Sequence, residues 1–144
     1  MISKAILILF FLLYLIVDVI ARCKYYQSVA VWGRVLCDGR PQNNVKVKLY
    51  EDDKWLDDLL NTTETNCNGV FKIRGSHYEK GPMDIHVNLY HYCTNGHRVC
   101  PRKYKIHVPY RFVFRGPRPR RPYKLGTIRM RSWEKKWGKR DCFN

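Results

Sequence analysis

The fold of this chain is decided by residues 29–50, which read VAVWGRVLCDGRPQNNVKVKLY. Every second residue from Val29 to Val35 is valine or glycine, and the stretch ends with lysines alternating with valine and leucine. Such period-two alternation predicts two strands, each with one buried face. Between them, Asp38-Gly39-Arg40-Pro41 combines a glycine that tolerates positive φ with a proline that fixes φ, which predicts a turn.

The same pattern of alternating apolar residues and turn residues continues through the rest of the chain. Short apolar runs separated by turn residues predict further strands at residues 59–65, 70–74, 85–92, 104–108 and 125–130. A brief helix near Trp55 to Leu60 is the alternative for that segment. About seven short strands favour an all-β, antiparallel β-sandwich, because a single sheet would leave its apolar face in water.

The N-terminal segment differs from this pattern. Lys4 precedes an unbroken apolar run from Ala5 to Val17, and Ala21 ends a stretch with small or branched residues at the positions of a cleavage site. We expect a signal peptide at residues 1–21 and one domain at 22–144. An uncleaved membrane anchor is the alternative, but it needs about 20 apolar residues, and Asp18 interrupts the run.

All the cysteines follow the predicted cleavage site, so they would enter an oxidising compartment. We expect disulfides among Cys23, Cys37, Cys67, Cys93, Cys100 and Cys142. Six cysteines allow about fifteen pairings, and the sequence favours only Cys93 with Cys100, because the residues 94–97 between them have turn chemistry. No CxxC pair is present, so we expect no metal site, and nothing points to a cofactor.

Several of these motifs, in this order, resemble the nematode transthyretin-like proteins. The resemblance rests on GRVLCDGRP at 33–41, VKVKLYEDD at 45–53, DDLL at 57–60, TNCNGVF at 65–71 and shorter matches up to Asp141-Cys142. It implies a transthyretin-like (prealbumin/immunoglobulin-like) sandwich that is secreted and acts as an extracellular binding or signalling module. Cys23 and Cys67 are additional to the family's usual four cysteines and could pair with each other.

Charge is distributed unevenly. The chain has 27 Lys and Arg against 12 Asp and Glu, a formal net charge of +15, yet no acidic residue lies between Asp84 and Glu134. Such a basic half attracts polyanions, and in a secreted protein these are anionic lipids or sulfated glycans; no nucleic-acid reading motif is present. The predicted contacts are Arg111, Arg115, Arg118, Arg120, Arg121 and Lys124. Two alternatives remain: a basic surface that serves only solubility, and a carrier of a small hydrophobic ligand, by analogy with transthyretin.

Acidic residues gather at positions 51–64. Their spacing does not fit an EF-hand loop, so we expect a solvated loop rather than a calcium site. Asn61-Thr62-Thr63 within this stretch is an N-glycosylation sequon, which predicts an exposed position for Asn61.

No constellation of residues predicts catalysis. The five histidines, His77, His86, His91, His97 and His107, show neither metal spacing nor an adjacent nucleophile. Strand phase predicts exposed rings for His86 and His107 and a hydrogen-bonded core position for His91. The purine-pathway hydrolase with a transthyretin-like fold ends in Tyr-Arg-Gly-Ser, whereas this chain ends Arg140-Asp-Cys-Phe-Asn144. We therefore expect a binding protein and not an enzyme.

Overall fold

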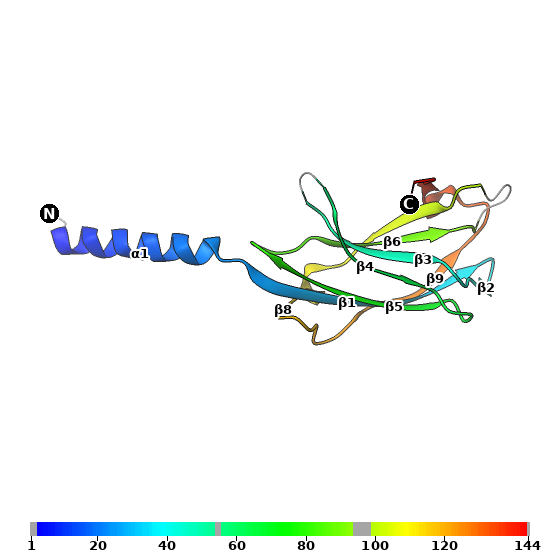
Figure 1. The fold of residues 1–144 in the computed structure, drawn as a ribbon, viewed down its shortest axis with the longest axis horizontal. Coiled ribbons are helices and arrows are strands. Elements are labelled where there is room, and N and C mark those ends of the chain that lie inside the picture. The colour runs from blue at the N-terminus through cyan, green and yellow to red at the C-terminus, as the bar shows by residue number, and fades with distance from the viewer. Residues whose placement is uncertain (1–2, 54–55, 94–98, 144) are drawn as a thin grey trace.

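The computed structural model describes residues 3–53, 56–93 and 99–143. Two β-sheets pack face to face, and α1 (Lys4–Arg22) projects from one end of this sandwich (Figure 1). Apolar side chains of α1 from Ile6 to Val19 are exposed. The sandwich predicted from residue alternation is therefore confirmed.

Within the described part of the chain, no helix meets the combination of length and hydropathy that a membrane span requires.

Sheet A is built around β1 (Tyr25–Cys37). Along one edge, β1 pairs antiparallel with β5 (Val70–Glu79), and along the other it pairs parallel with β9 (Tyr123–Met130). Two short strands complete the sheet. The last two residues of the predicted turn form β2 (Arg40–Pro41), which pairs with the end of β1, and β8 (Phe114–Arg115) lies beside the start of β1. The β1–β9 pair is the departure from the antiparallel arrangement that we expected.

Sheet B has the order β10 (Lys139–Arg140), β7 (Arg102–His107), β6 (Ile85–His91), β3 (Lys46–Glu51) and β4 (Asp58–Glu64), with every neighbouring pair antiparallel. Two short 3-10 helices, η1 (Tyr110–Phe112) and η2 (Lys135–Trp137), lie in the connections. All seven predicted strands are present. The alternative helix near 55–60 is wrong for its described residues, because Asp58 pairs with Glu51 and begins β4; Trp55 lies outside the described residues.

The inward faces of the two sheets form one apolar core. β1 contributes Val29, Val31 and Val35, which are fully buried, and Phe71 of β5 fills the space between the sheets. Gly33 makes room for this ring, since a Cβ at position 33 would lie only 2.8 Å from Phe71 Cε1. Gly33 of β1 and Phe71, which follows the Asn68-Gly69 turn, therefore pack directly against each other.

Two disulfides are present, and neither is the predicted pair. Cys37 bonds to Cys93, and Cys100 bonds to Cys142. The prediction of Cys93 with Cys100 was wrong because Cys93 continues the inward phase of His91 and is buried against β1, where Cys37 ends the strand. The turn expected at residues 94–97 lies outside the described residues.

Cys23 and Cys67 are free and exposed, so the pairing considered for them was also wrong. Cys23 precedes the first residue of β1, whereas Cys67 precedes Val70, which pairs with Arg34 near the far end of the same strand. About nine extended residues, roughly 30 Å, separate the two levels, and a disulfide needs Cα atoms within about 7 Å.

Candidate binding surface

The outer face of sheet A carries cations around an exposed tryptophan. Trp32 faces outward from the middle of β1, because Val31 and Gly33 on either side point into the core. The strand register places Lys72 of β5 on one side of Trp32 and Lys124 of β9 on the other. The Lys72 ammonium lies 4.7 Å from the centre of the Trp32 ring, within reach of a cation–π contact.

Two arginines extend this cluster along the strands. Arg34 and Arg74 are exposed at the outward positions of β1 and β5, and the Arg34 Nε donates a hydrogen bond to the Asn68 carbonyl at 2.9 Å. No acidic residue occupies an outward position of β1, β5 or β9. We call the five residues of this cluster the Trp32 face: Trp32, Arg34, Lys72, Arg74 and Lys124.

The Arg-Pro loop, residues 115–123, crosses the outer face of β1 beside this cluster. β8 pairs with β1 at Ser28, on the edge opposite to β5. Pro117 and Arg118 nevertheless line a hollow together with Arg74 of β5. The loop must therefore pass over β1, which explains why Ser28 is fully buried although its phase points outward. As a result, Arg118 lies at the margin of the Trp32 face.

The six predicted cations are all exposed, and none forms an ion pair with an acidic residue in the described ranges. Arg111, Arg121 and Lys124 line one hollow of about 540 Å³ with Phe112, whose ring centre lies 5.3 Å from the Arg111 guanidinium and 5.1 Å from that of Arg121. Arg115 lies instead over the Tyr25 ring, at 4.4 Å. The structure thus joins most of the predicted cations to the Trp32 face and places Arg115 at its N-terminal edge.

Sequence reasoning missed half of this surface. It concentrated on the acid-free second half of the chain, whereas Trp32, Arg34, Lys72 and Arg74 come from the first half. The signal was present in the strand phase, because residues between inward-pointing neighbours such as Val31 and Phe71 must face outward. What the sequence did not show is that β1 lies between β5 and β9.

The glycosylation sequon lies on the edge strand β4. Asn61 is exposed, as predicted, and its side-chain amide nitrogen donates a 2.7 Å hydrogen bond to the Arg74 carbonyl. Asn61 and Arg118 line the same hollow, so a glycan at this position would lie next to the Arg-Pro loop. Occupancy of the sequon stays a prediction.

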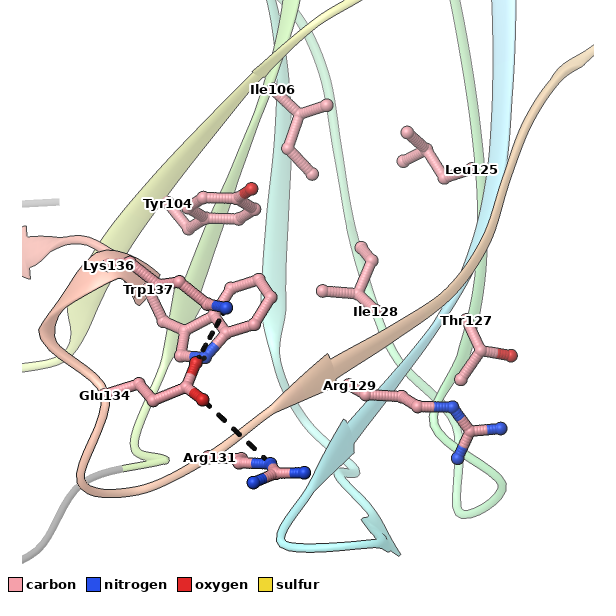
Figure 2. A pocket seen from close by; sticks show the side chains of 10 residues that line it. All are labelled: Tyr104, Ile106, Leu125, Thr127, Ile128, Arg129, Arg131, Glu134, Lys136 and Trp137. Atoms are coloured by element: carbon pink, nitrogen blue, oxygen red, sulfur yellow. Dashed lines mark hydrogen bonds and ion pairs between the residues drawn. The ribbon is translucent and has the colours of Figure 1, made fainter.

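A cleft of about 650 Å³ opens between β7 of sheet B and the edge strand β9 of sheet A. Figure 2 shows Tyr104 and Ile106 of β7 facing Leu125 and Ile128 of β9, with Trp137 at one end. These side chains are half-buried, so the two sheets do not close over each other along this edge. Thr127, Arg129 and Arg131 also line the cleft (Figure 2), so polar and charged side chains contribute to its walls.

Strand phase gave the right result for two of the described histidines and the wrong one for His86. His91 is fully buried, with Nε2 2.6 Å from the Trp137 carbonyl oxygen and Nδ1 accepting the Cys93 N–H at 3.2 Å. His107 is exposed, as expected. His86 points to the outer face of sheet B but is fully buried, because the Tyr50 ring stacks on it at 5.3 Å and the β3–β4 connection folds over it. His97 lies outside the described residues.

The β3–β4 connection is therefore not the freely solvated loop that we expected. Asp52 Oδ1 lies 2.9 Å from His86 Nδ1 but outside the direction of a hydrogen bond, and both Asp52 oxygens accept hydrogen bonds from Lys105 Nζ at 2.9 and 3.0 Å. Burial lowers the pKa of His86, although the nearby Asp52 carboxylate opposes this shift. The ion pair between Asp52 and Lys105 therefore fixes the β3–β4 connection to β7 beside His86.

Comparison with known proteins gives concordant matches. Residues 32–109 match the model of the transthyretin-like family. Transthyretin-like protein 5 of Caenorhabditis elegans is 40% identical over 106 residues, which cover 72% of this chain and 76% of the relative. Transthyretin-like protein 33 of the same organism is 37% identical over 122 residues, covering 83% of this chain and 85% of the relative.

Among solved structures, a 9R-lipoxygenase from Cyanothece PCC8801 aligns with 74% of this chain and 17% of its own, at a TM-score of 0.40 and 18% identity. That likeness is too loose to support an argument about function.

Proposed function

The chain belongs to the transthyretin-like family, and from this premise we propose that it is a secreted extracellular binding module that binds polyanions through the Trp32 face. The ligand chemistry is that of sulfate or phosphate groups presented in an array, as on a sulfated glycan or an anionic membrane. The role is one of binding rather than catalysis, and the partner lies outside the cell.

The observation that carries the proposal is that no acidic residue occupies an outward position of the three strands around Trp32, β1, β5 and β9. Lys72 and Lys124 flank the ring from two neighbouring strands, and Arg34 and Arg74 continue the same face. Like charges on neighbouring strands repel each other, and each solvated cation near an anionic surface gains about 1 kcal/mol. An anionic ligand relieves this repulsion between the cations and binds several of them at once.

The tryptophan supports the same role. An exposed indole costs apolar hydration, but its ring can stack on a sugar or sit at the headgroup level of a membrane while the neighbouring ammonium groups meet the anions. The Arg-Pro loop adds Arg118 at the margin, on a backbone that prolines restrain. The restrained backbone therefore loses little conformational entropy on binding, and the remaining entropic cost is that of the arginine side chain.

Retention on heparin and on phosphatidylserine vesicles across a salt series tests the proposal. The variant Lys72→Gln/Arg74→Gln/Lys124→Gln should bind about 100-fold more weakly, since three contacts of about 1 kcal/mol each are lost. A matched control, Lys80→Gln/Lys135→Gln/Lys139→Gln, removes the same charge from exposed sites elsewhere and should bind nearly as the wild type does.

A third variant, Arg118→Ser/Arg120→Ser/Arg121→Ser, measures the contribution of the loop. If the face variant and the control lose the same affinity, the basic residues act only through net charge and the proposed site is wrong. Binding to heparin but not to vesicles, or the reverse, distinguishes glycan from lipid as the source of the anions.

The cleft between β7 and β9 favours a second candidate function, that of a carrier for a small hydrophobic ligand. Its volume lies in the range of small-molecule sites, and apolar and aromatic side chains form one part of its walls while polar and charged side chains form the other. Ile128→Trp should fill the cleft and abolish the binding of an apolar fluorescent probe. Thr62→Trp, at an exposed position of β4 outside the cleft, is the control and should leave probe binding unchanged. Equal binding by both variants would exclude the cleft.

A further inference from the structure

The end of the sandwich where β1 begins lacks the covalent links that hold the other end. The disulfide Cys37–Cys93 links the last residue of β1 to the segment just after β6. The disulfide Cys100–Cys142 lies near the same end, because Arg102, two residues after Cys100, pairs with His91 at the end of β6. At the opposite end, where Tyr25 pairs with Glu79, the described residues contain no disulfide. Acidic side chains from both sheets meet there.

Three strands bring four potential ligands together at this end. Glu51 of β3 lies directly opposite Asp58 of β4 in sheet B, while His77 and Glu79 share the inward face of β5 in sheet A. His77 Nε2 lies 3.5 Å from Asp58 Oδ2 and 3.7 Å from Glu79 Oε2. One ligand atom each from Glu51, Asp58 and His77 lies within 4.8 Å of the others.

An independent observation points to a missing positive charge. Glu51 is 97% buried, at 3% exposure, and its Oε2 has no hydrogen-bond partner although it is inaccessible to water. The charged groups that act on Glu51 include the carboxylates of Asp53, Glu79 and Asp58. In the described ranges, no Lys or Arg side chain forms an ion pair with Glu51, Asp58 or Glu79.

We propose that Glu51, Asp58, His77 and Glu79 bind a divalent transition-metal ion of the zinc class and that this ion joins sheet A to sheet B. Zinc binds nitrogen and oxygen ligands at about 2.0–2.2 Å, so its tetrahedral ligands lie about 3.3 Å from one another. The distances around His77 are already close to that value. The imidazole favours zinc over calcium, which takes oxygen ligands.

The proposal changes the conclusion from residue spacing. From spacing along the chain, only the carboxylates of residues 51–64 were candidate ligands, and their spacing does not fit a calcium loop. The nitrogen ligand comes from β5 in the other sheet, at a distance along the sequence that no linear motif describes. The metal would link the two sheets at the end of the sandwich where the described residues contain no disulfide. None of its proposed ligands belongs to the Trp32 face.

Calorimetric titration of the purified protein with Zn²⁺, in a Cys23→Ser/Cys67→Ser background that removes the exposed thiols, tests the site. We expect one ion per chain, with an affinity at least tenfold weaker in each of Glu51→Gln, Asp58→Asn and His77→Gln. His107→Gln is the control, because His107 pairs loosely with Asp84 at 3.9 Å outside this cluster, and its affinity should not change. Ca²⁺ should bind more weakly than Zn²⁺.

Thermal unfolding separates a ligand role from a structural one. Without metal, Glu51→Gln should unfold at the same or a higher temperature than the background protein, because it removes a buried charge from a repulsive cluster. With Zn²⁺, the background protein and the His107→Gln control should gain thermal stability, and the three ligand variants should gain less at the same Zn²⁺ concentration. Absence of a Zn²⁺-dependent shift in the background protein, or an equal shift in all variants, would overturn the proposal, and so would tighter binding of Ca²⁺.

Discussion

At the scale of single residues, Gly69 carries a double constraint. Its φ is +73°, and a Cβ there would clash with the Val35 carbonyl, which accepts a hydrogen bond from Gln42 N–H at 3.0 Å. Gly39 has a similar φ of +80° but nothing within 4 Å of its would-be Cβ. Substitution of Gly39 therefore tests backbone strain alone, whereas substitution of Gly69 tests backbone strain and a steric clash together.

We predict that Gly39→Ala costs about 1 kcal/mol of unfolding free energy, the cost of the left-handed conformation alone. Gly69→Ala should cost about 2 kcal/mol more, because it also displaces the Val35 carbonyl from its hydrogen bond. Urea unfolding of both variants measures the difference. Equal losses would show that the turn moves away from β1 without penalty.

His91 makes stability depend on pH. Burial lowers its pKa, and the Cys93 N–H that faces Nδ1 requires the neutral ring, with Nε2 donating to the Trp137 carbonyl. In the unfolded chain the ring titrates near its ordinary value of about 6.5. Below that pH the unfolded state binds a proton that the folded state does not, so stability falls as the pH decreases.

The expected loss attributable to His91 is at most about 2 kcal/mol between pH 7 and pH 5. It should be absent in His91→Asn, which lowers stability at all pH values but flattens the pH profile relative to the wild type. Unfolding free energies measured at several pH values provide the test. Parallel profiles for the two proteins would assign the acid sensitivity to other groups.

At the scale of elements, the strands were predictable and their partners were not. Alternation around Val29, Val47 and Val87 identifies strands because each has one buried face, a property local to a few residues. The parallel pairing of β1 with β9 and the pairing of Cys37 with Cys93 depend on contacts between distant segments. For the same reason the sequence indicated Lys124 and Arg118 as binding residues but could not place Trp32 and Lys72 beside them.

The two disulfides should contribute unequally. Both close loops of similar length, with sequence separations of 56 and 42 residues, so chain entropy assigns about 4 kcal/mol to each. The sulfur of Cys93 also packs in the core and joins the two sheets, whereas Cys142 is exposed near the C-terminus. Removal of Cys37–Cys93 therefore loses packing as well as the covalent constraint.

We predict that Cys37→Ser/Cys93→Ser is destabilised by at least 1 kcal/mol more than Cys100→Ser/Cys142→Ser, since the hydroxyl introduced at position 93 is buried in an apolar site. Both should be made in the Cys23→Ser/Cys67→Ser background to prevent exchange. Urea midpoints compare them. A larger loss from the second pair would mean that the C-terminal segment, and not the junction between sheets, limits stability.

At the scale of the whole molecule, charge and covalent links divide the sandwich into distinct regions. Cations occupy the outer face of sheet A, a carboxylate cluster occupies the end where β1 begins, and both disulfides lie toward the other end. Long-range attraction of an anion acts mainly on the cationic face, because charges more than about 10 Å apart are screened at physiological salt. The binding surface and the proposed metal site can therefore act independently.

The projecting helix α1 gives the last prediction, which concerns export. Its apolar side chains are exposed and do not belong to the sandwich core (Figure 1), so the domain at 22–144 should keep its stability when residues 1–21 are removed. Intact-mass measurement of the product from a secreting cell line should give a chain that starts at Arg22, with any glycan at Asn61 as added mass.

Alkylation should modify two cysteines, Cys23 and Cys67, before reduction and all six afterwards. This count separates an oxidising route from a reducing one, because thiols pair only in the former. Full-length chains inside the cell with six reactive thiols would contradict export, and with it the extracellular polyanion as a partner. Modification of no cysteine before reduction would instead show that the two exposed thiols join separate molecules, since within one chain they lie too far apart to bond.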